Sequence, residues 1–261
     1  MNFTENRPNN MTSTLPILNS FDPISLSEMD SVKLLDRMDT KYMFNLDHLE
    51  YILEQLSSEY MVLTINGERF SHYETRYFDT SDMEMYLQHH NGKLNRQKVR
   101  FRSYLDSGCI FFEIKLKTNK GRTIKDRIKK EIFDFSIDGK SELMLKKFTN
   151  YDPAMLNEAI QINYTRITLV RKNMSERVTI DFGLKFQLND KEKCLPTLVI
   201  AEVKQDSTAR SPFISLMQTN YIPAQSLSKY CLGIASMNPN VKSNNFKRKL
   251  INIKKLCHDN S

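Results

Sequence analysis

The feature that most constrains the fold of this chain is a strict alternation of charged residues with apolar or small ones. In KVRFRSY, residues 98–104, the cations Lys98, Arg100 and Arg102 occupy every second position. A period of two is typical of a β-strand, because successive side chains point to opposite faces of a sheet. One face of this strand is therefore largely apolar, whereas the other places three cations in a row.

Other segments alternate in the same way. They are FFEIKLK (111–117), TIKDRIK (123–129), NYTRIT (163–168), ERVTIDF (176–182) and VIAEVK (199–204). With few helical segments beside them, they predict an α+β protein built on a largely antiparallel sheet or barrel. A sheet with one solvated face would give this pattern. A barrel with its charged faces inside and helices over its apolar outside would give it too, and periodicity does not distinguish the two.

The charged faces have two properties that suit phosphate binding. Their cations include many arginines, whose planar guanidinium groups bind phosphate oxygens in pairs. Isolated carboxylates, Glu113 and Glu202, also stand among these cations. A carboxylate can hold Mg²⁺ or Mn²⁺ together with water and phosphate oxygens. If the strands close into a barrel with these faces inside, its basic interior would suit a metal-bound polyphosphate.

Helices are predicted before, between and after the strands. They cover residues 25–39, 45–60, 140–149, 152–160, 209–219 and 225–236. The clearest is 45–60, whose apolar residues recur at helical spacing. Extended structure is also expected at 41–44 and 72–80.

Several kinds of site are excluded by missing motifs. The seven glycines form neither a dinucleotide-binding nor a P-loop pattern, and no zinc-type cluster of Cys and His is present. His89 and His90 are adjacent, so we expect surface histidines and not a joint metal site. The four cysteines are scattered without a C-x-x-C pair, which indicates reduced thiols. With no apolar run long enough for a membrane helix and no signal-peptide pattern, we expect a cytoplasmic protein.

The net charge of +7 is concentrated at one end of the sequence. Residues 237–261 contain six Lys or Arg and one acid, which gives +5 and leaves +2 for the rest. The high pI is therefore no argument for a nucleic-acid-binding core, and we expect no nucleic acid partner. In this tail, Phe246, Leu250 and Ile253 recur at helical spacing between basic residues. The tail either docks on an anionic membrane or a membrane-protein partner, or is a solvated basic end.

The order of several motifs resembles a known family. RMDTKYMF (37–44), RYFDT (76–80), KVRFRSY, FFEIKLK, AEVK (201–204) and SLSKY (226–230) follow one another as in the vacuolar transporter chaperone (VTC) domain, of the triphosphate tunnel metalloenzyme superfamily. The resemblance covers about residues 30–236. It implies a closed eight-stranded antiparallel β-tunnel, flanked by helices, whose charged lumen binds triphosphate or polyphosphate and a divalent metal. In eukaryotic members, a domain of this kind makes polyphosphate from ATP.

The resemblance also implies roles for individual residues. The matched phosphate-binding residues are Lys41, Arg100, Arg102, Lys115, Lys125, Tyr164, Arg166, Arg177 and Lys229. Glu202 matches the metal-binding glutamate, for Mn²⁺ or Mg²⁺. Arg100, Arg102, Lys115 and Glu202 are the residues expected to act in catalysis. Some members have a second lysine where this chain has Ser226, which weakens one phosphate contact.

These expectations define a domain plan and a set of functions. Residues 1–24 form a flexible arm, 25–237 a VTC-like tunnel domain, and 238–261 a basic tail. The expected reaction is metal-dependent phosphoryl transfer, in which catalysis is mostly positioning and charge stabilisation. The acceptor is a phosphate terminus in a polyphosphate polymerase that uses ATP, or water in a triphosphatase. A module that binds polyphosphate or a nucleotide without turnover, docked to a membrane partner, is the alternative.

Overall fold

The computed structural model describes residues 16–31, 37–120, 122–131, 134–206 and 210–258. The strands are β1 (Asp22–Ile24), β2 (Arg37–Asn45), β3 (Tyr60–Leu63), β4 (Ser71–Asp79), β5 (Arg96–Tyr104), β6 (Cys109–Lys117), β7 (Thr123–Lys129), β8 (Asn157–Arg171), β9 (Glu176–Leu188), β10 (Lys191–Leu195) and β11 (Leu198–Asp206). The helices are α1 (Leu26–Ser31), α2 (Leu49–Leu56), α3 (Glu84–His90), α4 (Gly139–Phe148), α5 (Pro212–Thr219), α6 (Lys229–Met237) and α7 (Lys247–His258). Within these ranges, no helix has the length and hydropathy needed to cross a membrane.

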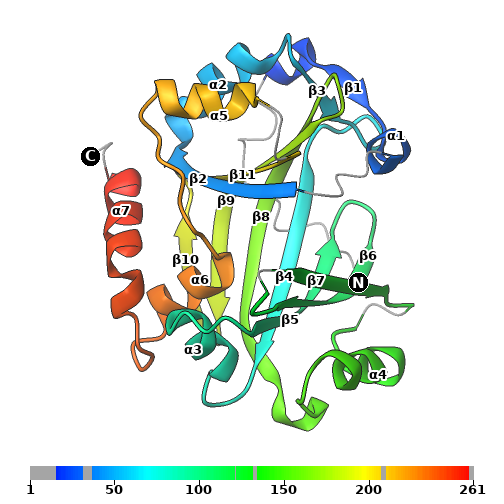
Figure 1. The fold of residues 1–261 in the computed structure, drawn as a ribbon, viewed down its shortest axis with the longest axis vertical. Coiled ribbons are helices and arrows are strands. Elements are labelled where there is room, and N and C mark those ends of the chain that lie inside the picture. Colours follow the sequence, from blue (N-terminus) through cyan, green and yellow to red (C-terminus); the bar gives the residue numbers. More distant parts are fainter. Residues whose placement is uncertain (1–15, 32–36, 121, 132–133, 207–209, 259–261) are drawn as a thin grey trace. The chain divides into compact units, whose positions relative to one another are not determined.

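The chain forms two compact units (Figure 1). The first comprises the described parts of Met1–Ser71, Thr165–Gly183 and Leu195–Leu227. The second comprises those of His72–Tyr164, Leu184–Cys194 and Ser228–Ser261. The long strands β8 and β9 contribute residues to both units.

The sheet is largely antiparallel, as the alternation predicted. In the first unit the strand order is β2-β11-β9-β8, and the short β3 pairs with β8 and, in parallel, with β1. In the second unit the order is β8-β4-β5-β6-β7, with β10 beside β9. The path from β2 to β7 holds the predicted eight strands, but no pairing of its two end strands is found in the described residues. The α+β class is therefore confirmed, whereas closure into a tunnel is not.

The first unit buries the apolar faces of its strands beneath helices. Phe44 of β2, Ile180 of β9 and Val203 of β11 share one core with Leu53 of α2 and Phe213 of α5. Ile180 and Val203 have charged or polar residues at both adjacent positions, and these point to the other face. The helices therefore cover the apolar face of these strands.

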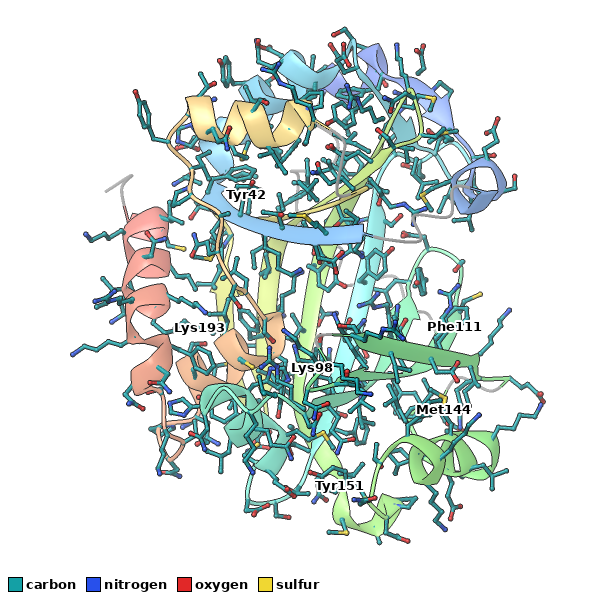
Figure 2. The ribbon with its side chains drawn as sticks, in the orientation of Figure 1. Tyr42, Lys98, Phe111, Met144, Tyr151 and Lys193 are labelled. Carbon is teal, nitrogen blue, oxygen red and sulfur yellow. The ribbon has the colours of Figure 1, made fainter. Side chains whose placement is uncertain are left out.

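The second unit repeats this arrangement on β5 and β6. Phe101 of β5 and Phe112 of β6 pack with Met144 and Leu145 of α4. In Figure 2, Met144 lies between these strands and α4, whereas Phe111 lies on the other side of the strands. Within this unit, the helix covers the apolar face and the charged face is turned away from it, which fits both a sheet with one solvated face and a barrel with a charged interior.

Two predicted helices were wrong in extent. The predicted helix at 25–39 is limited to α1, and its last residues belong to β2, while 32–36 lie outside the described residues. In the predicted helix at 152–160, only Pro153–Met155 is helical, and β8 begins at Asn157. The strand prevails because Ile160 and Ile162 continue the alternation that buries one face of β8. The sequence interpretation also missed α3, whose seven residues carry no strong helical pattern.

Candidate functional site

Glu113 of β6 is the centre of the first charged cluster, in the second unit. Only 1% of its surface is exposed, and Arg100 donates a hydrogen bond of 2.7 Å from Nε to its Oε2. Lys125 Nζ lies 3.1 Å from Oε1, and Arg102 Nε lies 3.9 Å from Oε2. Burial alone would raise the pKa of Glu113, but the charges of Arg100, Arg102 and Lys125 hold that pKa well below its usual range. The structure therefore brings three predicted phosphate-binding residues around one ionised carboxylate.

Strand register explains why these side chains meet. Arg100 is directly opposite Glu113 in the β5–β6 pair, and the next row along the strands contains Lys98, Lys115 and Lys125 as cross-strand neighbours. Like charges directly opposite one another destabilise a sheet. Partial burial among these cations lowers the pKa of Lys125 to about 8. The predicted Lys115 is exposed and lies in this lysine row.

Tyr77 also contacts Arg100, and Tyr230 packs on Tyr77. Arg100 Nη1 donates a 2.8 Å hydrogen bond to the hydroxyl of Tyr77, whose ring stacks on Tyr230 of α6 at 4.9 Å. The hydroxyl of Tyr230 donates to Asp79, a carboxylate that also accepts the backbone N–H groups of residues 85 and 86 in α3. Two of the motifs that carry the family resemblance, YFDT and SKY, are thus joined to each other. The sequence pattern identified both motifs but assigned no role to these three residues.

Lys229 lies at the first position of α6. Its Nζ is 4.7 Å from the centre of the Tyr164 ring, and that ring stacks in parallel on Tyr73 of β4. The preceding residue, Ser228, caps the helix and accepts a 2.8 Å hydrogen bond from Lys98. The structure therefore places Lys229 and Tyr164 together, in the same unit as Arg100.

Glu202 of β11 is the centre of the second charged cluster, in the first unit. It is directly opposite Lys41 of β2, with 3.1 Å between Nζ and Oε1, and Lys204 lies 3.4 Å away. Burial would raise the pKa of Glu202, but the charges of Lys204, Lys41 and Arg166 lower it far more. The carboxylate is ionised, and 23% of its side chain remains exposed.

The two other predicted arginines of this unit have protein partners. Arg166 of β8 donates two hydrogen bonds, of 2.5 and 2.8 Å, to the buried carboxylate of Asp181 in β9. Arg177 of β9 donates a 3.0 Å hydrogen bond to the backbone carbonyl of Met29 in α1. Asp181 was visible in the alternating pattern, but a pattern of period two cannot show which strand it faces.

Whether Glu202 can hold a metal ion depends on the other donor atoms near it. Among the described residues, no group of three or more His, Cys, Asp or Glu side chains is arranged to hold a metal ion. Mg²⁺ is commonly held by one or two carboxylates with substrate phosphates and water. The ionised, partly exposed Glu202 fits a metal that arrives with phosphates, and does not fit a metal held by protein ligands alone.

The two adjacent histidines differ from the surface pair expected. Both belong to α3, and His90 is buried with its Nε2 2.8 Å from Oδ1 of Asn244. Burial and the nearby Lys98 and Arg96 lower the pKa of His89 to about 2. The prediction of surface histidines was wrong because α3 was not recognised.

Most of the chain matches one known protein family. The family described as the VTC domain matches residues 36–238. Because this is most of the chain, the protein belongs to the VTC domain family, and the resemblance seen in its motifs is confirmed. Among curated proteins, none matches the chain.

Solved structures with a similar fold come from several organisms. A "putative adenylate cyclase" from Bacillus halodurans has a TM-score of 0.52 at 12% identity, over 78% of this chain and 97% of that one. One from Vibrio parahaemolyticus has a TM-score of 0.47 at 13% identity, over 75% and 97%. A "putative adenylyl cyclase" from Hippeastrum, described as having a dominant triphosphatase activity, has 0.46 at 11% identity, over 76% and 96%. At such identities, the first of these similarities shows the fold alone.

Proposed function

We propose that this protein catalyses metal-dependent phosphoryl transfer on a triphosphate or polyphosphate. In its polymerase form, the terminal oxygen of a phosphate chain attacks the γ phosphorus of ATP, the bond from that phosphorus to the β–γ bridging oxygen breaks, and ADP leaves. The closed tunnel implied by the VTC family would enclose that chain. Membership of the family supports this proposal, and the cluster around Glu113 carries it.

The charge balance of this cluster favours a polyanion. On the face of β5, β6 and β7 that carries Glu113, the described cations far outnumber this one carboxylate. They include Lys98, Arg100, Arg102, Lys115, Lys125 and Arg127. These cations repel one another, and partial burial strengthens the repulsion. Phosphate oxygens would relieve it through charge-assisted hydrogen bonds. Arg100 and Arg102 are the best placed donors, because their guanidinium groups are already held beside Glu113 and Tyr77.

The transfer step requires positioning and neutralisation of charge. The arginines and Lys125 would bind the phosphate oxygens and take up the charge that develops on the transferred group. In the first unit, Glu202 would hold a Mg²⁺ or Mn²⁺ ion that arrives with phosphates, and the metal would supply Lewis-acid polarisation. Lys41 and Lys204 keep Glu202 ionised and thus ready to act as a ligand.

One assay tests this proposal directly. Purified protein is incubated with Mn²⁺ or Mg²⁺ and either ATP or tripolyphosphate, and the products are separated by chain length. Formation of chains longer than the input supports the polymerase, and release of orthophosphate alone supports the triphosphatase. If well-folded protein binds these compounds with the metal present but converts none of them, phosphoryl transfer is wrong and a binding module remains.

The basic tail is proposed as a separate docking element. The tunnel domain at 25–237 and the tail at 238–261 would then be separate functional parts. In the expected arm at 1–24, by contrast, Leu18 and Phe21 belong to the core of the first unit, and β1 pairs with β3. In the structure the tail contains α7, whose exposed cations are Lys247, Arg248, Lys254 and Lys255. Its apolar residues Phe246 and Ile253 are buried. The partner would therefore meet a charged face, such as an anionic membrane surface, without insertion of those two residues.

A further inference from the structure

Two protein groups bind Arg100 through different nitrogens of its guanidinium group. Glu113 accepts a 2.7 Å hydrogen bond from Nε and lies 2.5 Å from Nη2. The hydroxyl of Tyr77 accepts a 2.8 Å hydrogen bond from Nη1. A guanidinium group carries five N–H donors in one plane. These contacts with described residues engage three of the five, so one N–H on Nη1 and one on Nη2 remain for a ligand.

The two partners affect the charge of Arg100 differently. Glu113 is a carboxylate, which also lies 3.1 Å from Nζ of Lys125, so it neutralises part of the charge that would attract phosphate. Tyr77 offers a hydroxyl oxygen, which orients the guanidinium group without cancelling its charge. A second carboxylate in its place would hold Arg100 as firmly but would repel a polyanion. The hydroxyl is therefore the partner that suits a phosphate site.

Tyr77 has little freedom of its own. It is directly opposite Arg100 in the β4–β5 pair, and only 6% of its surface is exposed. Its ring stacks on that of Tyr230 in α6, with 4.9 Å between ring centres and 22° between the two planes. The hydroxyl of Tyr230 is in turn bound to the buried carboxylate of Asp79. Strand register, ring stacking and a buried hydrogen bond therefore fix the position from which Tyr77 holds Arg100.

A fixed partner matters because arginine has a long, flexible side chain. An arginine that becomes ordered only when its ligand binds loses rotamer freedom, and this loss weakens binding. An arginine that is already ordered can bind two phosphate oxygens with its planar fork without that loss. We propose that Tyr77 is a positioning residue, whose hydroxyl holds Nη1 of Arg100 so that the guanidinium group is ordered before phosphate binds. This inference rests on the proposed function, and the family resemblance implies no role for Tyr77.

The test is a double-mutant cycle between Tyr77 and Arg100. Tyr77→Phe keeps the ring and its stacking and removes only the hydroxyl, whereas Arg100→Lys keeps the charge and removes the planar fork. Affinity for tripolyphosphate is measured by calorimetry at one fixed Mg²⁺ concentration for the natural chain, both single variants and the double variant. Thermal unfolding first shows that each of them is folded.

Tyr86→Phe is the matched control. Tyr86 is also fully buried in the second unit, its hydroxyl donates a 2.7 Å hydrogen bond to the backbone carbonyl of Lys242, and its ring also contacts Tyr230. Its hydroxyl does not bind Arg100. This control should unfold at a lower temperature than the natural chain, because it loses a buried hydrogen bond, and its affinity for tripolyphosphate should be unchanged.

The expected result is a loss that depends on Arg100. Tyr77→Phe should bind tripolyphosphate about three- to tenfold more weakly, which is the effect of ordering one long side chain on binding. In the Arg100→Lys background, Tyr77→Phe should cause no further loss, because no fork is left to orient. A further loss as large as in the natural chain would show that Tyr77 supports only the fold, and would overturn the inference.

The remaining outcomes separate this inference from the proposed function. If the natural chain binds tripolyphosphate and Tyr77→Phe binds it equally well, or if Tyr86→Phe shows the same loss, the positioning role is wrong and phosphate binding stands. If the natural chain does not bind tripolyphosphate, the proposed function fails and the role of Tyr77 fails with it.

Discussion

The hydroxyl of Tyr230 in α6 donates a hydrogen bond to the buried carboxylate of Asp79 at the end of β4, although 151 residues separate them in sequence. Burial raises the pKa of Asp79 in spite of this bond and of three backbone N–H donors. The same carboxylate accepts hydrogen bonds from the backbone N–H groups of Met85 and Tyr86, in the first turn of α3. One buried acid therefore fixes α3 and α6, and α6 carries Lys229.

Tyr230→Phe tests this link. The variant removes a hydrogen bond to a buried acid, and we expect a loss of about 1.5–3 kcal/mol in the free energy of unfolding. Urea denaturation measures the loss. Tyr221→Phe, at an exposed position, should stay within about 0.5 kcal/mol of the natural chain. A Tyr230→Phe variant as stable as this control would show that packing, and not the hydrogen bond, holds α6.

The sequence predicted which face of a strand a side chain occupies better than it predicted which residues that side chain contacts. Alternation alone placed Arg100 and Glu113 on charged faces, and the structure confirms the face of each because a period of two is fixed by strand geometry. The same pattern cannot set register, which brings Arg100 opposite Glu113. Contacts such as Tyr230 with Asp79 lay beyond prediction for a similar reason, because local periodicity carries no information on pairs so distant in sequence.

Errors in the helix predictions have a related cause. Residues 157–160 form a short segment that mixes polar and apolar residues. Their pairing in the sheet outweighs any local helical preference. The surroundings of Phe111 could not be predicted either, because Phe111 stands on the charged face of FFEIKLK but its ring contact with Tyr104 lies on another strand. Strand pairing therefore defines the site, while composition defines only its chemistry.

Arg102→Ala should weaken binding of tripolyphosphate at least tenfold and leave the fold intact. A charge-assisted contact of this kind contributes about 1.5–3 kcal/mol. Arg100→Ala should weaken binding similarly but also lower stability, because Glu113 would lose its closest cation while it stays buried. Calorimetry and thermal unfolding of both variants check this contrast. Unchanged affinity in both would show that this face of the sheet does not bind phosphate.

Lys125 should make phosphate affinity depend on pH. Its pKa is lowered from 10.5 to about 8, so the free protein loses this charge as pH rises through 8. A bound polyanion favours the protonated amine, so affinity for tripolyphosphate should be constant below about pH 8 and fall above it, by at most tenfold for each pH unit. Lys125→Arg stays charged and should abolish the fall. Lys140→Arg on α4, an exposed matched change, should keep it, and a fall that persists in Lys125→Arg would assign the titration to another group.

Glu202→Gln should separate metal use from phosphate binding. The amide is a poorer ligand for Mg²⁺ or Mn²⁺, and it also removes the charge that Lys41 and Lys204 now neutralise. We expect turnover to fall roughly 10- to 100-fold, on the order of the loss of a metal-site interaction. Binding of tripolyphosphate without metal should be unchanged or tighter, because two cations lose their carboxylate partner. Equal loss of turnover and of metal-free binding would mean that Glu202 only orients a cation.

The basic face of α7 should bind anionic membranes without the help of its buried side. Phe246, immediately before this helix, packs on Tyr86 and His90 of α3, so deletion of the whole tail would remove part of the fold. The sharper variant replaces four exposed cations, Lys247, Arg248, Lys254 and Lys255, by Gln.

This variant should keep its thermal stability and its triphosphate turnover. Its affinity for vesicles that contain phosphatidylserine should fall by about 1 kcal/mol for each basic residue at the membrane surface, as measured by sedimentation with the vesicles. The matched control replaces four other exposed lysines of the same unit by Gln: Lys93, Lys120, Lys140 and Lys191. An equal loss in both variants would show that net charge, and not the face of α7, determines binding to the membrane. An unchanged affinity in the α7 variant would remove α7 as the docking element.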